Sequence, residues 1–284
     1  MDAGPCVSLR GQFSLAPPAR AGVSEAIPNS RFEDCSAKSA RDDKRMVFSM
    51  NDFLTALALL TIVPVRYREP ISARAYVYFP LVGLLIGLFL TTALFLLCRM
   101  FPNLIASAVV LGVWVILCGG LHLDGFADAC DGLFAVTTRE RRLEILRDVH
   151  LGTFGAVGLM LLLIVKFATI ASATSFAPIL LAPVLGRWAM VFAAVFPLAR
   201  SGGMAALFRA GLTRRIVYVA TIFAALGCVF FGVFGLTAFV AAFVVALFIA
   251  RLALDRLGGL TGDIYGMICE SVEVGVLLLG GLSF

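Results

Sequence analysis

Three aspartates, Asp124, Asp128 and Asp131, lie within eight residues of one another in the segment GGLHLDGFADACDG at 119–132. In a helix, their i, i+4, i+7 spacing would place them on one face. Carboxylates this close repel one another, and a bound divalent cation would remove that penalty. Mg²⁺ prefers oxygen ligands from one or two carboxylates, with water and phosphate completing its shell. The pattern predicts a magnesium site, and the alternative is a solvated helix end with ordinary capping aspartates.

Other polar residues around this cluster have types that suit phosphate binding. His122 lies two residues before Asp124 and is a candidate contact for phosphate or metal. Downstream, the segment RERRLEILRDVHLGTFG at 139–155 places Arg147 and Asp148 just before a Gly-x-x-Gly turn. Its helix-spaced charges favour an amphipathic interfacial helix with salt bridges. For Arg147 this structural role and phosphate binding stay equally open, whereas for Asp148 a functional role is favoured.

Charged side chains also interrupt the apolar segments farther along the chain. Arg187 and Lys166 each lie within a long apolar run, where an ionisable residue is a functional candidate by default. Asp263 and Glu270 are seven residues apart, so a helix would place them on one face. This second acidic patch could supply a second metal site or a general base. For Lys166 and Glu273, a structural ion pair is the alternative.

The elements that position these residues are predicted to be membrane-spanning helices. Of the 284 residues, 61% are hydrophobic and only 14% are charged, against roughly 25% charged in soluble domains. Long apolar runs indicate transmembrane helices, and the alternation of a barrel is absent. The predicted fold is an all-α polytopic transmembrane helix bundle with about seven spans plus one short re-entrant or interfacial segment. The spans are 75–98, 104–121, 154–176, 178–199, 264–284 and the two parts of 216–254, split near 233–236; the short segment is 53–65.

Loop charge predicts how the bundle is oriented. Arginine-rich loops alternate along the chain with turns that carry only Arg99 or no charge, and basic loops usually face the cytoplasm. The three long polar segments, 122–153, 200–215 and 251–263, then all lie on the cytoplasmic side. No basic stripe interleaved with aromatic residues points to nucleic acid. The active site is therefore expected to face the cytoplasm.

The N-terminal part of the chain differs in composition from the rest. Residues 1–46 are rich in Ala, Ser, Pro, Arg and Asp and show no hydrophobic periodicity. Met46 and Met50 both precede the first apolar stretch, so a later translation start is an equal alternative. Residues 1–50 are expected to form a disordered or untranslated extension, and 51–284 the transmembrane catalytic domain.

The motifs together resemble those of the cobalamin synthases, the adenosylcobinamide-GDP ribazoletransferases. The element His-x-Asp-Gly-x-x-Asp-x-x-Asp-Gly at 122–132 is long and specific. The likeness runs in order from about residue 52 to the C-terminus. It also includes LEILRD at 143–148, LGTFG at 151–155, Gly186-Arg187, Ala199-Arg200, and GLTGD at 259–263 with Glu270.

The resemblance implies a Mg²⁺-dependent, multi-pass enzyme of the bacterial inner (cytoplasmic) membrane. It would join α-ribazole, or α-ribazole 5′-phosphate, to adenosylcobinamide-GDP, the last assembly step of coenzyme B12. GMP would leave as the ribazole 5′-oxygen attacks a phosphorus, forming adenosylcobalamin or its 5′-phosphate. Whether the enzyme forms a homo-oligomer stays open. By motif match, Asp124, Asp128 and Asp131 bind Mg²⁺, Asp148 and Asp263 are second-metal ligands or the base, Arg187 and Arg200 clamp phosphate, and His122, Arg147 and Glu270 contact substrate.

Two features set limits to this resemblance. Where the family motif has Asp-Ser-Arg, this chain has Asp148-Val-His150, so either His150 substitutes or the loop does not contact phosphate. The membrane-bound CDP-alcohol phosphotransferases also have clustered aspartates, but their motif continues with Arg where Asp128 follows Ala127. They are the alternative enzyme class. A transporter is the third class, because intramembrane charges and glycine-interrupted helices suit it.

Overall fold

The computed structural model describes residues 49–66, 73–200, 204–209 and 211–282. Residues 1–48 of the predicted extension lie outside this part of the chain. In the described residues the regular elements are helices. There is also one isolated parallel β-bridge, between Leu198 and Leu260. The helices are α2 (Met50–Leu60), η2 (Ala73–Tyr78), α3 (Phe79–Leu97), α4 (Asn103–Leu117), α5 (Leu121–Phe134), α6 (Arg139–Ile145), α7 (Thr153–Ala171), α8 (Ala177–Ala193), α9 (Met204–Arg209), α10 (Arg214–Val229), α11 (Gly232–Leu257) and α12 (Gly262–Gly280).

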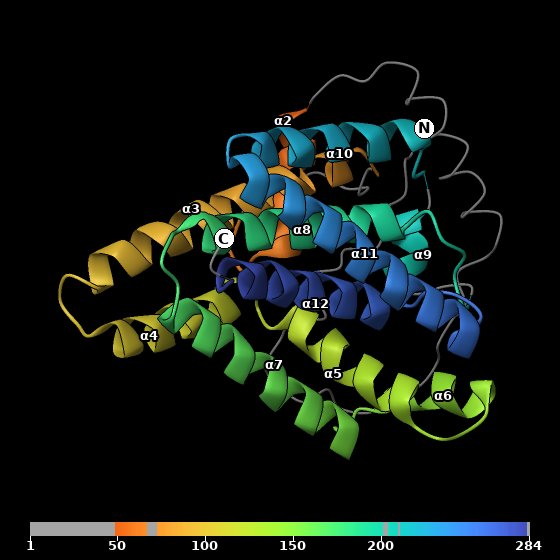
Figure 1. Cartoon of the computed structure of the whole chain (residues 1–284). Helices are drawn as coiled ribbons and strands as arrows, with labels where there is room; N and C mark the ends of the chain where they lie inside the picture. The colour runs from red at the N-terminus through yellow and green to blue at the C-terminus, as the bar shows by residue number, and fades with distance from the viewer. Residues whose placement is uncertain (1–48, 67–72, 201–203, 210, 283–284) are drawn as a thin grey trace.

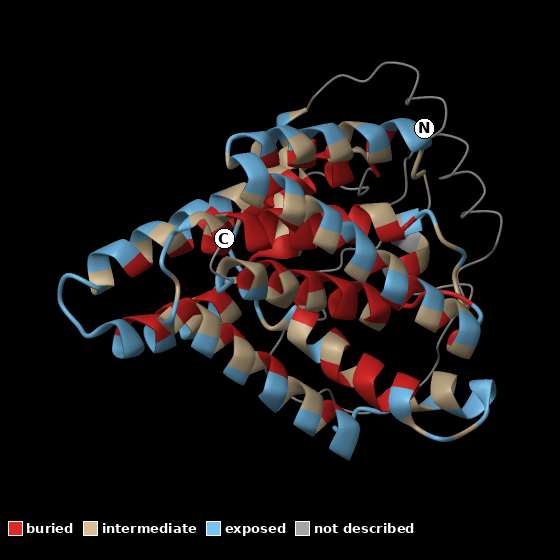
Figure 2. Cartoon of the chain, in the orientation of Figure 1, coloured by how far each residue is buried: buried red, intermediate tan, exposed pale blue. Residues whose placement is uncertain are grey.

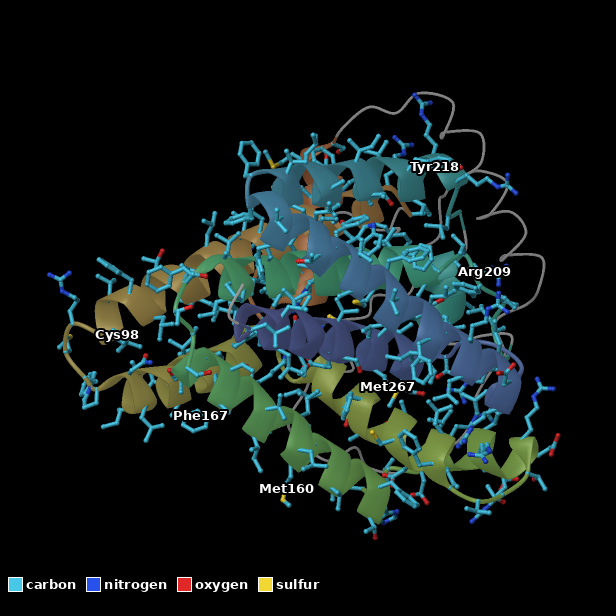
Figure 3. The ribbon with its side chains drawn as sticks, viewed as in Figure 1. Cys98, Met160, Phe167, Arg209, Tyr218 and Met267 are labelled. Carbon is cyan, nitrogen blue, oxygen red and sulfur yellow. The ribbon has the colours of Figure 1, made fainter. Side chains whose placement is uncertain are left out.

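Helix α12 lies at the centre of the bundle. It packs against α8 and α11 on one side and against α5 and α7 on the other (Figure 1). The buried residues concentrate on α8 and α12, whereas the outer faces of α3, α7 and α10 are exposed (Figure 2). Met267 of α12 is buried beside α5, while Met160 of α7 points outward and is 61% exposed (Figure 3). An apolar side chain on the outer face is what a lipid-facing helix presents.

Helices α3 and α8 approach closely because α3 carries two glycines on one face. A Cβ on Gly87 would collide with the backbone carbonyl of Leu180, and one on Gly83 would collide with that of Pro183. These glycines form a Gly-x-x-x-Gly pattern, which lets helix backbones come together in membranes. The sequence motif thus accounts for the close contact between α3 and α8, and α8 also packs against α12.

The acidic segment is separated from the preceding apolar helix by a sharp bend. Helices α4 and α5 meet at 88°, and the turn between them contains Gly119 and Gly120 with φ values of 65° and 67°. A residue with a Cβ disfavours this left-handed conformation, so two glycines suit the turn. The aspartates therefore lie on a helix of their own and not on the end of a straight span.

The prediction of membrane helices is confirmed, but the number of seven spans is not. Within the described residues, three helical segments are long and apolar enough to cross a membrane, and the bent pair α4–α5 makes up to four. Helices α2 and α8 are apolar but shorter. With 17 residues, α8 is about 25 Å long, below the thickness of a typical hydrocarbon core. The predicted break in 216–254 is present slightly earlier, at 230–231 between α10 and α11.

Candidate active site

The three aspartates share one stripe of α5 but differ in exposure. Asp124 is exposed, Asp128 is half-buried and Asp131 is buried. Asp128 interacts electrostatically with Asp124, with Asp131 and with Asp263 of α12. Carboxylates gathered in this way disfavour one another's ionised form unless a cation is bound. The helical spacing predicted from the sequence is confirmed, and α12 adds a fourth carboxylate.

A close crossing of α5 and α12 brings Asp263 to this stripe. A Cβ on Gly125 would lie 3.1 Å from the Cα atom of Asp263, so the two backbones touch where α12 begins. The hydroxyl of Thr261 donates a hydrogen bond to Asp263 Oδ2 at 3.0 Å, which orients the carboxylate. Asp263 therefore faces the aspartates of α5, whereas Glu270, the other member of the predicted second acidic patch, is ion-paired with Lys166.

The segment after α8 places a cation beside these acids. The amide of Ala199 donates to the carbonyl oxygen of Leu260 at 2.9 Å, which ties this segment to the start of α12. Arg200 follows directly and interacts electrostatically with Asp263. Its Nη1 atom is buried and has no hydrogen-bond partner among the described residues. A guanidinium with donors left over is suited to a phosphate oxygen.

Asp131 has a different set of contacts from the other two aspartates of α5. Its Oδ2 accepts a hydrogen bond from the amide of Gly152 at 2.8 Å, and its Oδ1 accepts one from Gly155 at 2.9 Å. Both amides belong to the first turn of α7, where Gly152 is the N-cap residue. Both oxygens of this carboxylate are thus already bound to the protein.

Arginine side chains cap the C-terminal end of α5. Arg142 Nη1 donates to the carbonyl oxygens of Gly132 and Leu133 at 3.0 and 2.5 Å, and Arg256 also donates to Leu133. Cations at a helix C-terminus satisfy free carbonyl groups and favour the helix dipole. Arg139 does the same for α11, donating to Leu257 at 2.7 Å. Sequence reasoning missed these caps, since it treated the arginines as surface charges.

The 146–152 loop does not bring Asp148 to the acidic stripe. Arg147, Asp148 and His150 are all exposed. His150 Nδ1 and Asp148 Oδ1 are 2.6 Å apart, and the His150 amide also donates to this oxygen at 3.1 Å. These hydrogen bonds from His150 hold the pKa of the Asp148 carboxyl below its ordinary value. Asp148 is therefore ionised at neutral pH and accepts a proton poorly.

Four buried charges form a network deeper in the bundle. Arg187 of α8 pairs with Glu273 of α12, and Lys166 of α7 pairs with both Glu273 and Glu270. The structural alternative expected for Lys166 and Glu273 is confirmed. Arg187 also donates to Cys118 Sγ at 3.1 Å, a partner the sequence gave no signal for. Glu270 is two turns along α12 from Asp263, which is roughly 10 Å.

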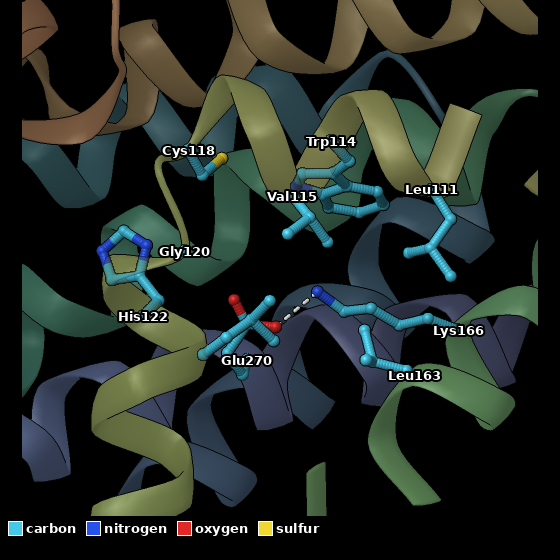
Figure 4. Close-up of a pocket in the computed structure, with 10 residues that line it drawn as sticks. Leu111, Trp114, Val115, Cys118, Gly120, His122, Leu163, Lys166 and Glu270 are labelled. Carbon is cyan, nitrogen blue, oxygen red and sulfur yellow. Dashed lines mark hydrogen bonds and ion pairs between the residues drawn. The ribbon is translucent and has the colours of Figure 1, made fainter. Parts of the chain in front are cut away.

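His122 points into this interior and away from the aspartates. It lies roughly 200° around the α5 axis from Asp124. Its ring is buried, and neither nitrogen has a hydrogen-bond partner among the described residues. Together with Trp114, Lys166 and Glu270 it lines a cavity of about 10 Å³ (Figure 4). A cavity of this size is roughly large enough for one water molecule. The structure does not bring His122 to the site where phosphate or metal was expected.

The described residues contain no group of three or more His, Cys, Asp or Glu side chains that could together hold a metal ion. Magnesium needs fewer protein ligands, because it commonly binds one or two carboxylates and takes its other ligands from water and substrate phosphate. The carboxylates around Asp128 supply oxygen ligands of this kind, and the unpartnered N–H group of Arg200 could bind the phosphate that completes the shell.

Comparisons with known proteins agree with the motifs. Residues 52–281 match the family model described as cobalamin-5-phosphate synthase. A protein of Roseiflexus sp. (strain RS-1) named adenosylcobinamide-GDP ribazoletransferase is 39% identical over 238 residues, covering 80% of this chain and 88% of its own. Proteins with the same name from Pseudomonas savastanoi pv. phaseolicola and Desulfitobacterium hafniense are 38% and 34% identical, covering 81% and 82% of this chain and 98% and 96% of their own.

No solved structure matches the chain significantly. The family model covers most of the sequence, and these relatives exceed 30% identity over nearly their whole length. The alternative families therefore receive no support. The chain belongs to the cobalamin-5-phosphate synthase family.

Proposed function

We propose that this chain joins α-ribazole, or α-ribazole 5′-phosphate, to adenosylcobinamide-GDP and releases GMP. The family and the names of the relatives support this activity. The structural observation that carries it is the meeting of the α5 aspartates with Asp263 and Arg200 at one end of the bundle. Acids that hold a cation, beside a guanidinium with free donors, form a site for a pyrophosphate.

Asp124 and Asp128 are the residues that would hold Mg²⁺. They are one helical turn apart, and Asp128 also interacts electrostatically with Asp263. Bound there, Mg²⁺ would neutralise the charge that develops on the pyrophosphate as GMP leaves. Arg200 would bind a phosphate oxygen through its unpartnered Nη1. The aspartates would thus act through the cation that they hold, Arg200 would act directly on phosphate, and none of them needs to form a covalent bond.

The bonds that form and break follow from the products. Release of GMP requires that the attacked phosphorus is the one attached to the corrinoid, and that its bond to the bridging oxygen breaks. A ribazole hydroxyl oxygen forms the new bond and loses its proton. The 5′-oxygen expected from the sequence is excluded as the nucleophile when the 5′-phosphate is the substrate, because that oxygen is already esterified. A ring hydroxyl of the ribose is then the nucleophile.

Asp263 is the better candidate for the base than Asp148. Asp263 faces the aspartate stripe, whereas Asp148 is exposed and already hydrogen-bonded to His150. Arg187 and Glu270 belong to the buried ion network, in which Arg187 connects α8 to α12 and Glu270 connects α12 to α7. Of the two arginines assigned to phosphate binding, we therefore retain Arg200 and no longer include Arg187.

The site is proposed to face the cytoplasm from the inner membrane. The support is the loop charge: the segments that form the site, 122–153 and 251–263, carry arginines, and such loops stay on the cytoplasmic side. Nucleotide-activated substrates and Mg²⁺ are available on that side.

Membranes containing the protein provide the test of the activity. With adenosylcobinamide-GDP, α-ribazole and Mg²⁺, we expect release of GMP and formation of a corrinoid with the lower ligand, and both should stop when a chelator is added. Asp124→Asn and Asp128→Asn should lower the rate at least about 100-fold. Release of CMP from a CDP-alcohol, or solute movement into sealed vesicles without nucleotide consumption, would instead support the other two classes.

A further inference from the structure

We propose that Asp131 is a positioning residue that anchors the start of α7 to α5, and that it is not one of the ligands that hold Mg²⁺. The part of this proposal that concerns the metal rests on the proposed function. The part that concerns α7 rests on the geometry of the fold alone.

The carboxylate of Asp131 acts as an N-cap supplied by another helix. An α-helix leaves its first amides without intrahelical partners, and a Ser, Thr, Asp or Asn side chain at the N-cap usually accepts from them. The N-cap of α7 is Gly152, which has no side chain, and no capping hydrogen bond from it exists. Asp131 instead accepts from Gly152 and Gly155, one amide on each oxygen. Its negative charge also favours the positive end of the α7 dipole.

The two glycines of the Gly-x-x-Gly turn make room for this carboxylate. A Cβ on Gly152 would lie 2.7 Å from the Asp131 Cγ, and a Cβ on Gly155 would collide with Oδ2 and approach the Ala127 carbonyl oxygen at 2.8 Å. These glycines therefore let α7 pack directly on α5. This contact between helices accounts for the Gly-x-x-Gly turn that follows Arg147 and Asp148 in the sequence.

The anchor affects the site through Asp128. Asp131 lies one turn after Asp128 and two turns after Asp124 on the same stripe. Holding Asp131 against α7 fixes the rotation of α5 about its axis, and this rotation sets the direction in which Asp124 and Asp128 point. Asp131 is thus required for the arrangement of the ligands without being a ligand.

The test compares Asp131→Asn with Asp124→Asn in the full-length protein in lipid nanodiscs. An asparagine has one acceptor oxygen, so its NH₂ group would face one of the two amides. Hydrogen exchange at the amides of 152–156 should become at least about tenfold faster in Asp131→Asn and stay unchanged in Asp124→Asn. Gly155→Ala should reproduce the Asp131→Asn exchange pattern, because its Cβ displaces the carboxylate.

Metal binding is measured directly, with Mn²⁺ as the probe and electron paramagnetic resonance as the readout. Asp131→Asn should weaken Mn²⁺ binding by about tenfold, because α5 then holds its ligands less well, whereas Asp124→Asn, which removes a ligand, should weaken it by at least about 100-fold. Weakening by Asp131→Asn as large as that by Asp124→Asn, with the α7 amides still protected, would overturn the proposal. If the wild type binds no Mn²⁺, the proposed metal site fails, and unchanged exchange in Asp131→Asn then also refutes the anchor.

Discussion

Arg187 on α8 and Glu273 on α12 form an ion pair in the interior of the bundle, and neither side chain is exposed. Lys166 on α7 joins the same carboxylate and also contacts Glu270 at 2.5 Å. The network holds two cations and two carboxylates, so it is neutral as a whole and links three helices. Because charges in an apolar interior need partners, removing one member leaves an uncompensated charge.

We therefore expect Arg187→Met to destabilise the protein by about 3–5 kcal/mol, since Lys166 would be left with two carboxylates. Glu273→Met should cost a similar amount for the opposite reason. The double variant keeps the neutral Lys166–Glu270 pair and should return to within about 1 kcal/mol of the wild type. Unfolding by denaturant in detergent micelles measures all three. Additive losses in the double variant would show that the two residues are not coupled.

A second prediction concerns the α3–α8 contact. Gly87→Ala should destabilise the bundle by about 1–3 kcal/mol, because the added Cβ meets the backbone of Leu180. Gly112→Ala in α4 is the matched control: a Cβ there has no atom within 4 Å, so the higher helix propensity of alanine should make the change neutral or slightly stabilising. Equal effects of the two substitutions in the same unfolding assay would contradict the close contact.

The third prediction compares Asp263 and Asp148, the two aspartates that the sequence analysis gave the same candidate roles. Asp263→Asn should lower the rate of GMP release at least about 100-fold, because Asp263 is the proposed base. Asp148→Asn should change the rate by less than about threefold, since this side chain is exposed and bound to His150. Rates are compared at saturating Mg²⁺ in the same membranes. The reverse order of the two effects would return the catalytic role to the 146–152 loop.

Arg200 provides the fourth prediction. Arg200→Ala should lower kcat/KM for adenosylcobinamide-GDP by about 10–100-fold, the value expected for a lost charged hydrogen bond to phosphate. Arg200→Lys should recover part of the loss, because it keeps the charge but not the planar donor arrangement. Arg99→Ala serves as a control, since Arg99 follows the C-terminal end of α3 and lies over the ring of Phe95. An equal loss in the control would point to a general effect on folding.

Much of the acidic site could be predicted from the sequence because it depends on local periodicity. The i, i+4, i+7 spacing placed Asp124, Asp128 and Asp131 on one face of a helix, and α5 has this form. The apolar runs identified the helices, and the split predicted near 233–236 lay a few residues after the actual break between α10 and α11. These features involve residues a few positions apart, whose geometry is set by the backbone itself.

The partners of each side chain were decided only by the tertiary structure. Asp131 binds amides 21 and 24 residues away, and Lys166 meets Glu270 across 104 residues. Such contacts depend on where helices cross, and the crossing of α5 with α12 is set by close packing at Gly125 and Gly266. The sequence by itself determined a membrane protein with an aspartate stripe and its family. The tertiary structure decided that Asp131 holds α7, that Asp263 faces the stripe and that Arg200 lies near Asp263, because helix packing fixes which distant groups can meet.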